Sequence, residues 1–165
     1  MNMTIRLNRK TCLLLALACV SAISVLPARA QGSPTLETRG ASYYTFQHVV
    51  YQNDGGWPDN KAYFHRLLNH IEAHITATEG KVEIRVVSFA AGVQLFIIAR
   101  DDADLAKQID GLRAKGVRFL MCHNTLEGMK LKASDLYHVA EGDVVPSGVA
   151  EIARLQGRGY VYIHP

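Results

Sequence analysis

The stretch Val117-Arg118-Phe119-Leu120-Met121-Cys122-His123-Asn124-Thr125-Leu126 decides the fold, because within it an apolar strand runs directly into a helix start. Other strand-like runs, rich in β-branched and aromatic residues, lie at 46–52, 81–89, 144–145 and 160–163. Helical patterns with one apolar face lie between them, at 59–79, 102–115 and 147–156. Strands that alternate with helices predict one α/β domain over about 45–165, with a parallel sheet covered on both faces.

Polar residues mark the expected helix starts. Asp59, one of Asp101 and Asp102, and Ser147 each stand where an N-cap is favoured. Asn124 or Thr125 is expected to cap a short turn after Cys122, since Asn124 and Glu127 have the spacing of a capping box. The apolar segment 93–99 cannot be assigned to a helix or a strand by periodicity alone.

The first 30 residues have the pattern of a secretory signal peptide. Three basic residues near the start precede an apolar run over 11–26, and Ala28-Arg29-Ala30 fits a cleavage site. We expect cleavage after Ala30 rather than a lipid anchor on Cys19, followed by a loose arm over 31–44. The mature protein is then periplasmic or secreted. No later run approaches the roughly 20 apolar residues that a membrane span needs.

The expected mature chain is nearly neutral. The leader takes four of the 18 basic residues and no acidic ones, which leaves 14 basic against 15 acidic side chains and a net charge of −1. Nothing in this balance suggests a phosphate-binding surface, so we expect no nucleic-acid partner. The remaining 135 of the 165 residues suffice for one domain with its own core.

Cys122 is the one cysteine of the expected mature chain, so no internal disulfide forms. Open parallel sheets bind ligands beyond the carboxyl ends of their strands, where Cys122 ends a predicted strand. The adjacent helix start favours the thiolate, and His123 adds a proton acceptor or a nearby cation. A packing role for Cys122 stays open, because free cysteines are among the most buried residues.

Further candidate binding residues follow the other strands at the same edge of the sheet. Those expected to line a small-ligand site beside Cys122 are Asn53, Asp54, Ser88, His123, Asn124, Thr125, Ser147 and Gly148.

No metal site or cofactor is predicted. His70 and His74 have the i, i+4 spacing of helical zinc ligands, but no third ligand accompanies them, and we interpret them as surface histidines. Glycine-rich phosphate motifs and the Gly-x-Ser-x-Gly motif are missing from the sequence.

Four motifs carry a family resemblance. They are Asn53-Asp54-Gly55-Gly56, Cys122-His123-Asn124-Thr125-Leu126, Val145-Pro146-Ser147-Gly148-Val149-Ala150-Glu151 and Gly159-Tyr160-Val161-Tyr162-Ile163-His164-Pro165. On these motifs the chain from Val49 to Pro165 resembles the DsrE/DsrF-like family, in its branch of small stand-alone proteins.

The resemblance implies a three-layer, flavodoxin-like α/β subunit with a mainly parallel sheet of about five strands. It also implies a homo-oligomer, typically a trimer or hexamer, and the apolar segment 93–98 gives a further reason to expect self-association. Sulfur-relay members carry a persulfide on a cysteine, and Cys122 matches that position. Cys122 is therefore a candidate sulfur carrier or sulfurtransferase-like residue, with sulfur donor and acceptor proteins as partners. The alternative is a non-catalytic oligomer that binds a small ligand or is structural, with Cys122 in a packing role.

Overall fold

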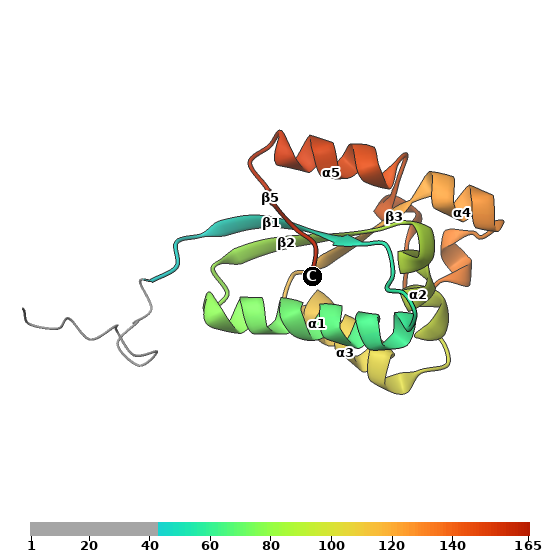
Figure 1. The fold of residues 1–165 in the computed structure, drawn as a ribbon, viewed down its shortest axis with the longest axis horizontal. Coiled ribbons are helices and arrows are strands. Elements are labelled where there is room, and N and C mark those ends of the chain that lie inside the picture. Colours follow the sequence, from blue (N-terminus) through green and yellow to red (C-terminus); the bar gives the residue numbers. More distant parts are fainter. Residues whose placement is uncertain (1–42) are drawn as a thin grey trace, which may run out of the picture. The chain divides into compact units, whose positions relative to one another are not determined.

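Five parallel strands form one sheet in the computed structural model, which describes residues 43–165 (Figure 1). They lie in the order β4-β3-β2-β1-β5, which confirms the predicted parallel α/β fold. The predicted signal peptide and most of the N-terminal arm lie outside the described residues. The strands are β1 (Gln47–Asn53), β2 (Val82–Ser88), β3 (Arg118–Cys122), β4 (Val144–Val145) and β5 (Val161–Ile163).

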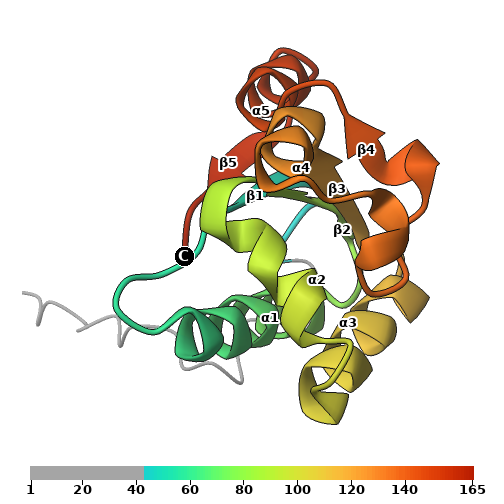
Figure 2. The same ribbon diagram turned by 90° about the vertical axis from the view of Figure 1, so that its right-hand side faces the viewer.

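Helices cover the sheet on both faces in a three-layer, flavodoxin-like arrangement. Parallel connections are right-handed, so the steps from β1 to β2 and from β2 to β3 place α1 and α3 on one face. The chain then returns from β4 to the opposite edge, which places α5 on the second face, opposite α1 and α3 (Figures 1 and 2). The helices are α1 (Asn60–Ala77), α2 (Gln94–Ile98), α3 (Ala103–Ala114), α4 (His123–Met129) and α5 (Gly148–Gln156), with 3₁₀ turns η2 (Ala90–Val93), η3 (Ala133–Asp135) and η4 (Glu141–Asp143).

Three of the expected helix caps are confirmed. The side chain of Asp59 accepts from the N–H of residue 62, Asp102 accepts from those of residues 104 and 105, and Ser147 accepts from that of residue 150. The expected cap of α4 is wrong. Helix α4 begins at His123 with Cys122 as its N-cap, so the residues expected as caps already lie in its first turn.

Two apolar layers of unequal size stabilise the sheet. The larger lies under α1, α2 and α3 and contains Val49, Tyr51 and Met121 of the strands. The smaller lies under α5 and contains Val50, Val87, Leu120, Ile152 and Leu155. Neighbouring strand residues thus alternate between the two layers. The expected cover on both faces is confirmed, with α5 as the long helix over the second face.

The apolar segment 93–98 packs inside its own subunit. It forms the end of η2 and all of α2, in which Val93, Leu95 and Phe96 are fully buried. Ile97 and Ile98 pack against the larger apolar layer. The argument for self-association from this segment is therefore wrong, and the predicted trimer or hexamer depends on the family resemblance.

His74 is a packed side chain rather than a surface histidine. Its Nδ1 lies 2.8 Å from the hydroxyl of Tyr51, and its Nε2 lies 2.7 Å from Oε1 of Gln47. The amide oxygen can only accept, so Nε2 carries the proton and Nδ1 accepts from the tyrosine. Burial lowers the pKa of His74 below its ordinary value, in agreement with a neutral ring. His70 is exposed, as expected.

Gly92 is needed where the loop after β2 crosses the end of β1. A Cβ at this position would lie 1.9 Å from the carbonyl oxygen of Asn53. The same carbonyl accepts from the N–H of Phe89 at 3.0 Å, so it is fixed in place. The close approach of these two backbones therefore excludes any side chain at position 92.

We expect Gly92→Ala to lower the free energy of unfolding by about 1 to 3 kcal/mol or more, because the new methyl group forces two backbones apart. The matched control is Gly111→Ala in α3, where no atom lies within 4 Å of the new Cβ. That change should raise stability by about 0.5 to 1 kcal/mol. Chemical denaturation measures both values, and equal effects of the two substitutions would contradict the close approach at Gly92.

Candidate functional site

The carboxyl ends of the strands meet at one edge of the sheet, as the sequence led us to expect. Asn53 of β1 is paired in register with Ser88 of β2, and Cys122 of β3 is paired with Val145 of β4. Helix α5 begins three residues after β4, at Gly148. The candidate residues of all these segments are thus close to the same edge, although they do not all face the same side.

The thiol of Cys122 is surrounded by hydrogen-bond donors from two helices. Cys122 ends β3 and is buried, with 5% of its surface exposed. The backbone N–H groups of Asn124 and Thr125, in the first turn of α4, donate to its sulfur. The Thr125 hydroxyl and the N–H of Gly148, at the start of α5, also donate. Two helix N-termini therefore converge on one sulfur atom.

This environment favours the thiolate. Burial is the largest single influence on the pKa of Cys122 and raises it. The donors from Gly148, Thr125 and Asn124 together outweigh burial, so that the pKa of the thiol lies below its ordinary value. Hydrogen bonds to the charged form and the positive end of a helix dipole both act in this direction.

Gly148 lets the start of α5 approach the sulfur. A Cβ at this position would lie 3.0 Å from the ring of Phe89 and 3.2 Å from the Cβ of Cys122. The space is therefore filled by Phe89, so a side chain at position 148 would move the N–H away from the thiol. Phe89 was not predicted as a site residue, because no local sequence pattern indicates that the residue after β2 contacts the start of α5.

Thr125 connects the thiol to the loop after β2. Its hydroxyl donates to Cys122 and accepts from the N–H of Ala90 at 3.1 Å. Ala90 has a φ of 47°, in the left-handed region that alanine rarely adopts. The hydrogen bond to Thr125 helps to hold this loop conformation.

Asn53 and Ser88 lie on the other face of the sheet from Cys122. Both are fully buried, on the side of α1. The amide of Asn53 donates to the hydroxyl of Ser88 at 3.0 Å and to the carbonyl of Gly92 at 2.9 Å. Its Oδ1 has no hydrogen-bond partner among the described residues. These residues therefore fix the ends of β1 and β2 and do not line a site with the thiol.

Asp54 belongs to a separate polar group near the end of the chain. Its carboxylate accepts from the amide of Gln52 at 2.9 Å and lies 3.0 Å from Nε2 of His164. Strand β2 separates β1, which precedes Asp54, from β3, which carries Cys122. Asp54 is thus not part of the immediate surroundings of the thiol.

The remaining candidates differ in their relation to Cys122. Asn124 is exposed and contributes through its backbone, while Ser147 caps α5 and so supports the position of Gly148. His123 is exposed and lines a hollow of about 250 Å³ together with Leu131 and Glu141. Within the described residues, no hydrogen bond joins the ring of His123 to the thiol.

Residues 43–165 show neither a cluster of metal ligands nor a helix suited to a membrane. No three His, Cys, Asp or Glu side chains of this part of the chain gather closely enough to hold a metal ion. None of its helices combines the length and the apolar character that crossing a bilayer requires.

Comparisons with known proteins agree with the fold. The model of the DsrE/DsrF-like family matches residues 51–165. The structure is similar to that of the MTH1491 protein of unknown function from Methanobacterium thermoautotrophicum, with a TM-score of 0.61 and 33% sequence identity. The match covers 72% of this chain and 99% of that chain. No curated protein matches. The chain therefore belongs to the DsrE/DsrF-like family, a membership that supports a sulfur-relay-related role in general.

Proposed function

We propose that this protein is an exported sulfur carrier that holds sulfane sulfur as a persulfide on Cys122. One observation carries the proposal: the sulfur of Cys122 receives hydrogen bonds from the start of α4 and from the start of α5. The thiolate is the nucleophile in sulfur transfer, and these donors stabilise its negative charge. They would stabilise the anion of a persulfide in the same way.

The proposed transfer needs no oxidant. The thiolate of Cys122 attacks the outer sulfur of a donor persulfide, R–S–SH. The S–S bond of the donor breaks, and its inner sulfur leaves as the thiolate R–S⁻ with the electron pair. A new S–S bond forms, which gives Cys122–S–SH. Attack by the thiolate of an acceptor on the outer sulfur of Cys122–S–SH then regenerates the Cys122 thiolate. Since the proposed mature chain has no second cysteine, the acceptor is another molecule.

A second candidate function is a non-catalytic oligomer that binds a small ligand or is structural, with Cys122 used for packing. The 5% exposure of Cys122 and its contact with the start of α5 favour this alternative. A trimer or hexamer remains a prediction under both functions.

Export is part of the proposal, and we expect the protein recovered from the secreting cell to begin at Gln31. The leader before this residue has the pattern that signal peptidase removes. Intact mass spectrometry of the protein from the periplasmic or secreted fraction measures the N-terminus. Full-length protein confined to the cytoplasm would contradict export and would leave the carrier chemistry unaffected.

The stability that Cys122 gives to the fold should increase with pH. Because its pKa is lower in the folded state than in the unfolded chain, folding favours the thiolate. The advantage of the wild type over Cys122→Ser in free energy of unfolding should grow as pH rises from the lowered pKa towards the unfolded value of about 8.5, and should then level off. Denaturation at a series of pH values measures this difference. An advantage that falls as pH rises would contradict the stabilised thiolate.

Loss of one donor should raise the pKa of the thiol. We expect Thr125→Val to move the thiolate titration, followed by ultraviolet absorbance, towards the ordinary thiol range. Thr76→Val on the exposed side of α1 is the matched control and should leave the titration unchanged. A pKa that is equal in all three proteins would exclude the Thr125 hydroxyl as a stabilising donor.

Sulfur uptake tests the function itself. After incubation with a small persulfide donor, the intact mass of the mature wild type should increase by one sulfur atom, whereas that of Cys122→Ser should not change. Incubation with an acceptor thiol should reverse the gain. If the wild type takes up no sulfur from several donors, or if both proteins gain equally, the ligand-binding or structural oligomer is the better account.

A further inference from the structure

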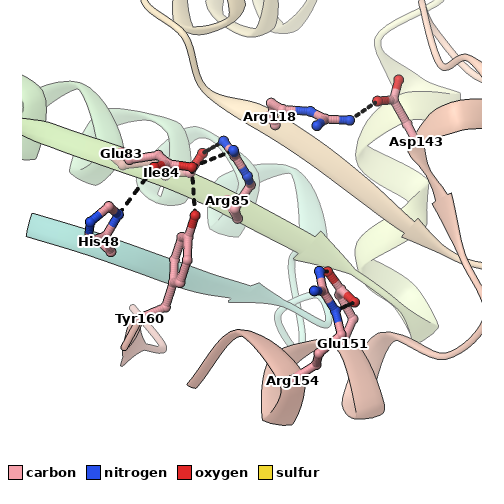
Figure 3. Close-up of polar contacts among 9 residues, drawn as sticks. All are labelled: His48, Glu83, Ile84, Arg85, Arg118, Asp143, Glu151, Arg154 and Tyr160. Carbon is pink, nitrogen blue, oxygen red and sulfur yellow. Dashed lines mark hydrogen bonds and ion pairs between the residues drawn. The ribbon is translucent and has the colours of Figure 1, made fainter. Parts of the chain in front are cut away.

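A polar groove of about 430 Å³ lies on the second face of the sheet, beside α5. Its floor comes from the early parts of β2 and β3, and its wall comes from the second half of α5. Four arginines line it: Arg85 and Arg118 from the sheet, and Arg154 and Arg158 from α5 and the residues after it. These residues are spread over the sequence, so their convergence results from the fold alone. Figure 3 shows three of them with the acidic partners.

Each carboxylate at the groove holds one guanidinium group. Glu83 forms an ion pair with Arg85, and Asp143 lies 3.5 Å from Arg118. Glu151 is bound at two points, with Nε and Nη2 of Arg154 at 2.7 and 2.6 Å from its oxygens. No carboxylate of residues 43–165 forms an ion pair with the remaining Arg158. The groove therefore carries more guanidinium groups than acids.

The carboxylates of Glu83 and Glu151, which line the groove, already have hydrogen-bond and ion-pair partners within the chain. Glu83 accepts from the hydroxyl of Tyr160 at 2.6 Å and lies 3.1 Å from Nδ1 of His48, in addition to its pair with Arg85 (Figure 3). The hydrogen bond from Tyr160 is the largest cause that lowers the pKa of Glu83. Glu151 is 8% exposed, and its two-point pair with Arg154 compensates its burial. Glu83 and Glu151 therefore orient the guanidinium groups of Arg85 and Arg154.

The arginines keep donors for a ligand. A guanidinium has five N–H groups, and Arg154 uses two of them on Glu151. The side chains of Arg118 and Arg154 are 53% and 52% exposed, so their remaining N–H groups are accessible. Guanidinium groups bind carboxylate and tetrahedral oxyanions at two points. The volume lies within the range of small-molecule sites and exceeds the needs of one tetrahedral ion.

We propose that this groove binds a small molecule that carries at least two anionic oxygen groups, such as carboxylates or phosphates. The sheet arginines would bind one group, and Arg154 and Arg158 on the opposite wall would bind the other. A second copy of the chain is a poorer occupant, because Glu83, Asp143 and Glu151 are already paired within their own groove and leave no free acid for the arginines of the other copy.

The arginine-lined groove and the surroundings of the Cys122 thiol are separate sites. Leu120 lines it and precedes Cys122 by two residues on β3, so both lie on the same face of the sheet. Cys122 itself does not line the groove. Anion binding is therefore expected to be independent of sulfur uptake, and Cys122→Ser should bind the anion as the wild type does.

Calorimetry with citrate and with inorganic pyrophosphate at constant ionic strength tests the site. We expect saturable one-to-one binding of at least one of them to the wild type, and at least a tenfold loss of affinity in Arg118→Gln and in Arg158→Gln. The matched control is Lys107→Gln, which removes the same charge from the exposed side of α3 and should bind as the wild type does. Thermal unfolding of each variant without anion verifies that it is folded.

Three results of the calorimetry would overturn the site. These are no binding of either anion to the wild type, an equal loss in the Lys107 control, and full affinity in both arginine variants. If the groove instead joins two copies, the arginine variants will lower the molar mass in light scattering without affecting anion affinity, which also overturns the proposal. Because Cys122→Ser is expected to retain binding, failure here is distinguishable from failure of sulfur uptake.

Discussion

The return of the chain from β4 to the far edge of the sheet is the constraint on which the rest of the structure depends. Right-handed connection makes α5 cross the second face, whereas the two longer helices, α1 and α3, lie on the first. The start of α5 then comes to the end of β3, and its second half lies beside uncovered strand residues. The position of α5 thus explains two features: the hydrogen bond from the N–H of Gly148 to Cys122, and the arginine-lined groove.

The surroundings of Cys122 show how an apolar layer can contain a charge. Burial alone would keep the thiol protonated, and it is the largest single influence on its pKa. The unpaired N–H groups at helix starts have no partners within their own helices, so they are free to bind an acceptor. Two such starts meet at Cys122, and no positively charged side chain is needed to favour the thiolate.

Much of the fold could be predicted because its signals are local. The strand runs and the caps at Asp59, Asp102 and Ser147 each depend on a few neighbouring residues. The site was harder to predict than the fold. The strands are apolar on both faces, so their sequence does not indicate which face of the sheet a side chain occupies. The sequence therefore predicts one shared site for Asn53, Ser88 and Cys122, although Asn53 and Ser88 face the opposite layer. The role of Phe89 and the convergence of the arginines depend on tertiary contacts that no local pattern encodes.

The hydroxyl of Thr125 has a single proton, and that proton is used on the sulfur of Cys122 while the oxygen accepts from Ala90. A hydroxyl that donates to an anion becomes a stronger acceptor, because hydrogen bonds in a chain polarise one another. Ala90 needs this contact, since its left-handed backbone is unfavourable for alanine. The loop after β2 is therefore held more firmly when the sulfur is ionised than when it is protonated. The protonation state of Cys122 in β3 is thus coupled, through one hydroxyl, to the hydrogen bond at Ala90.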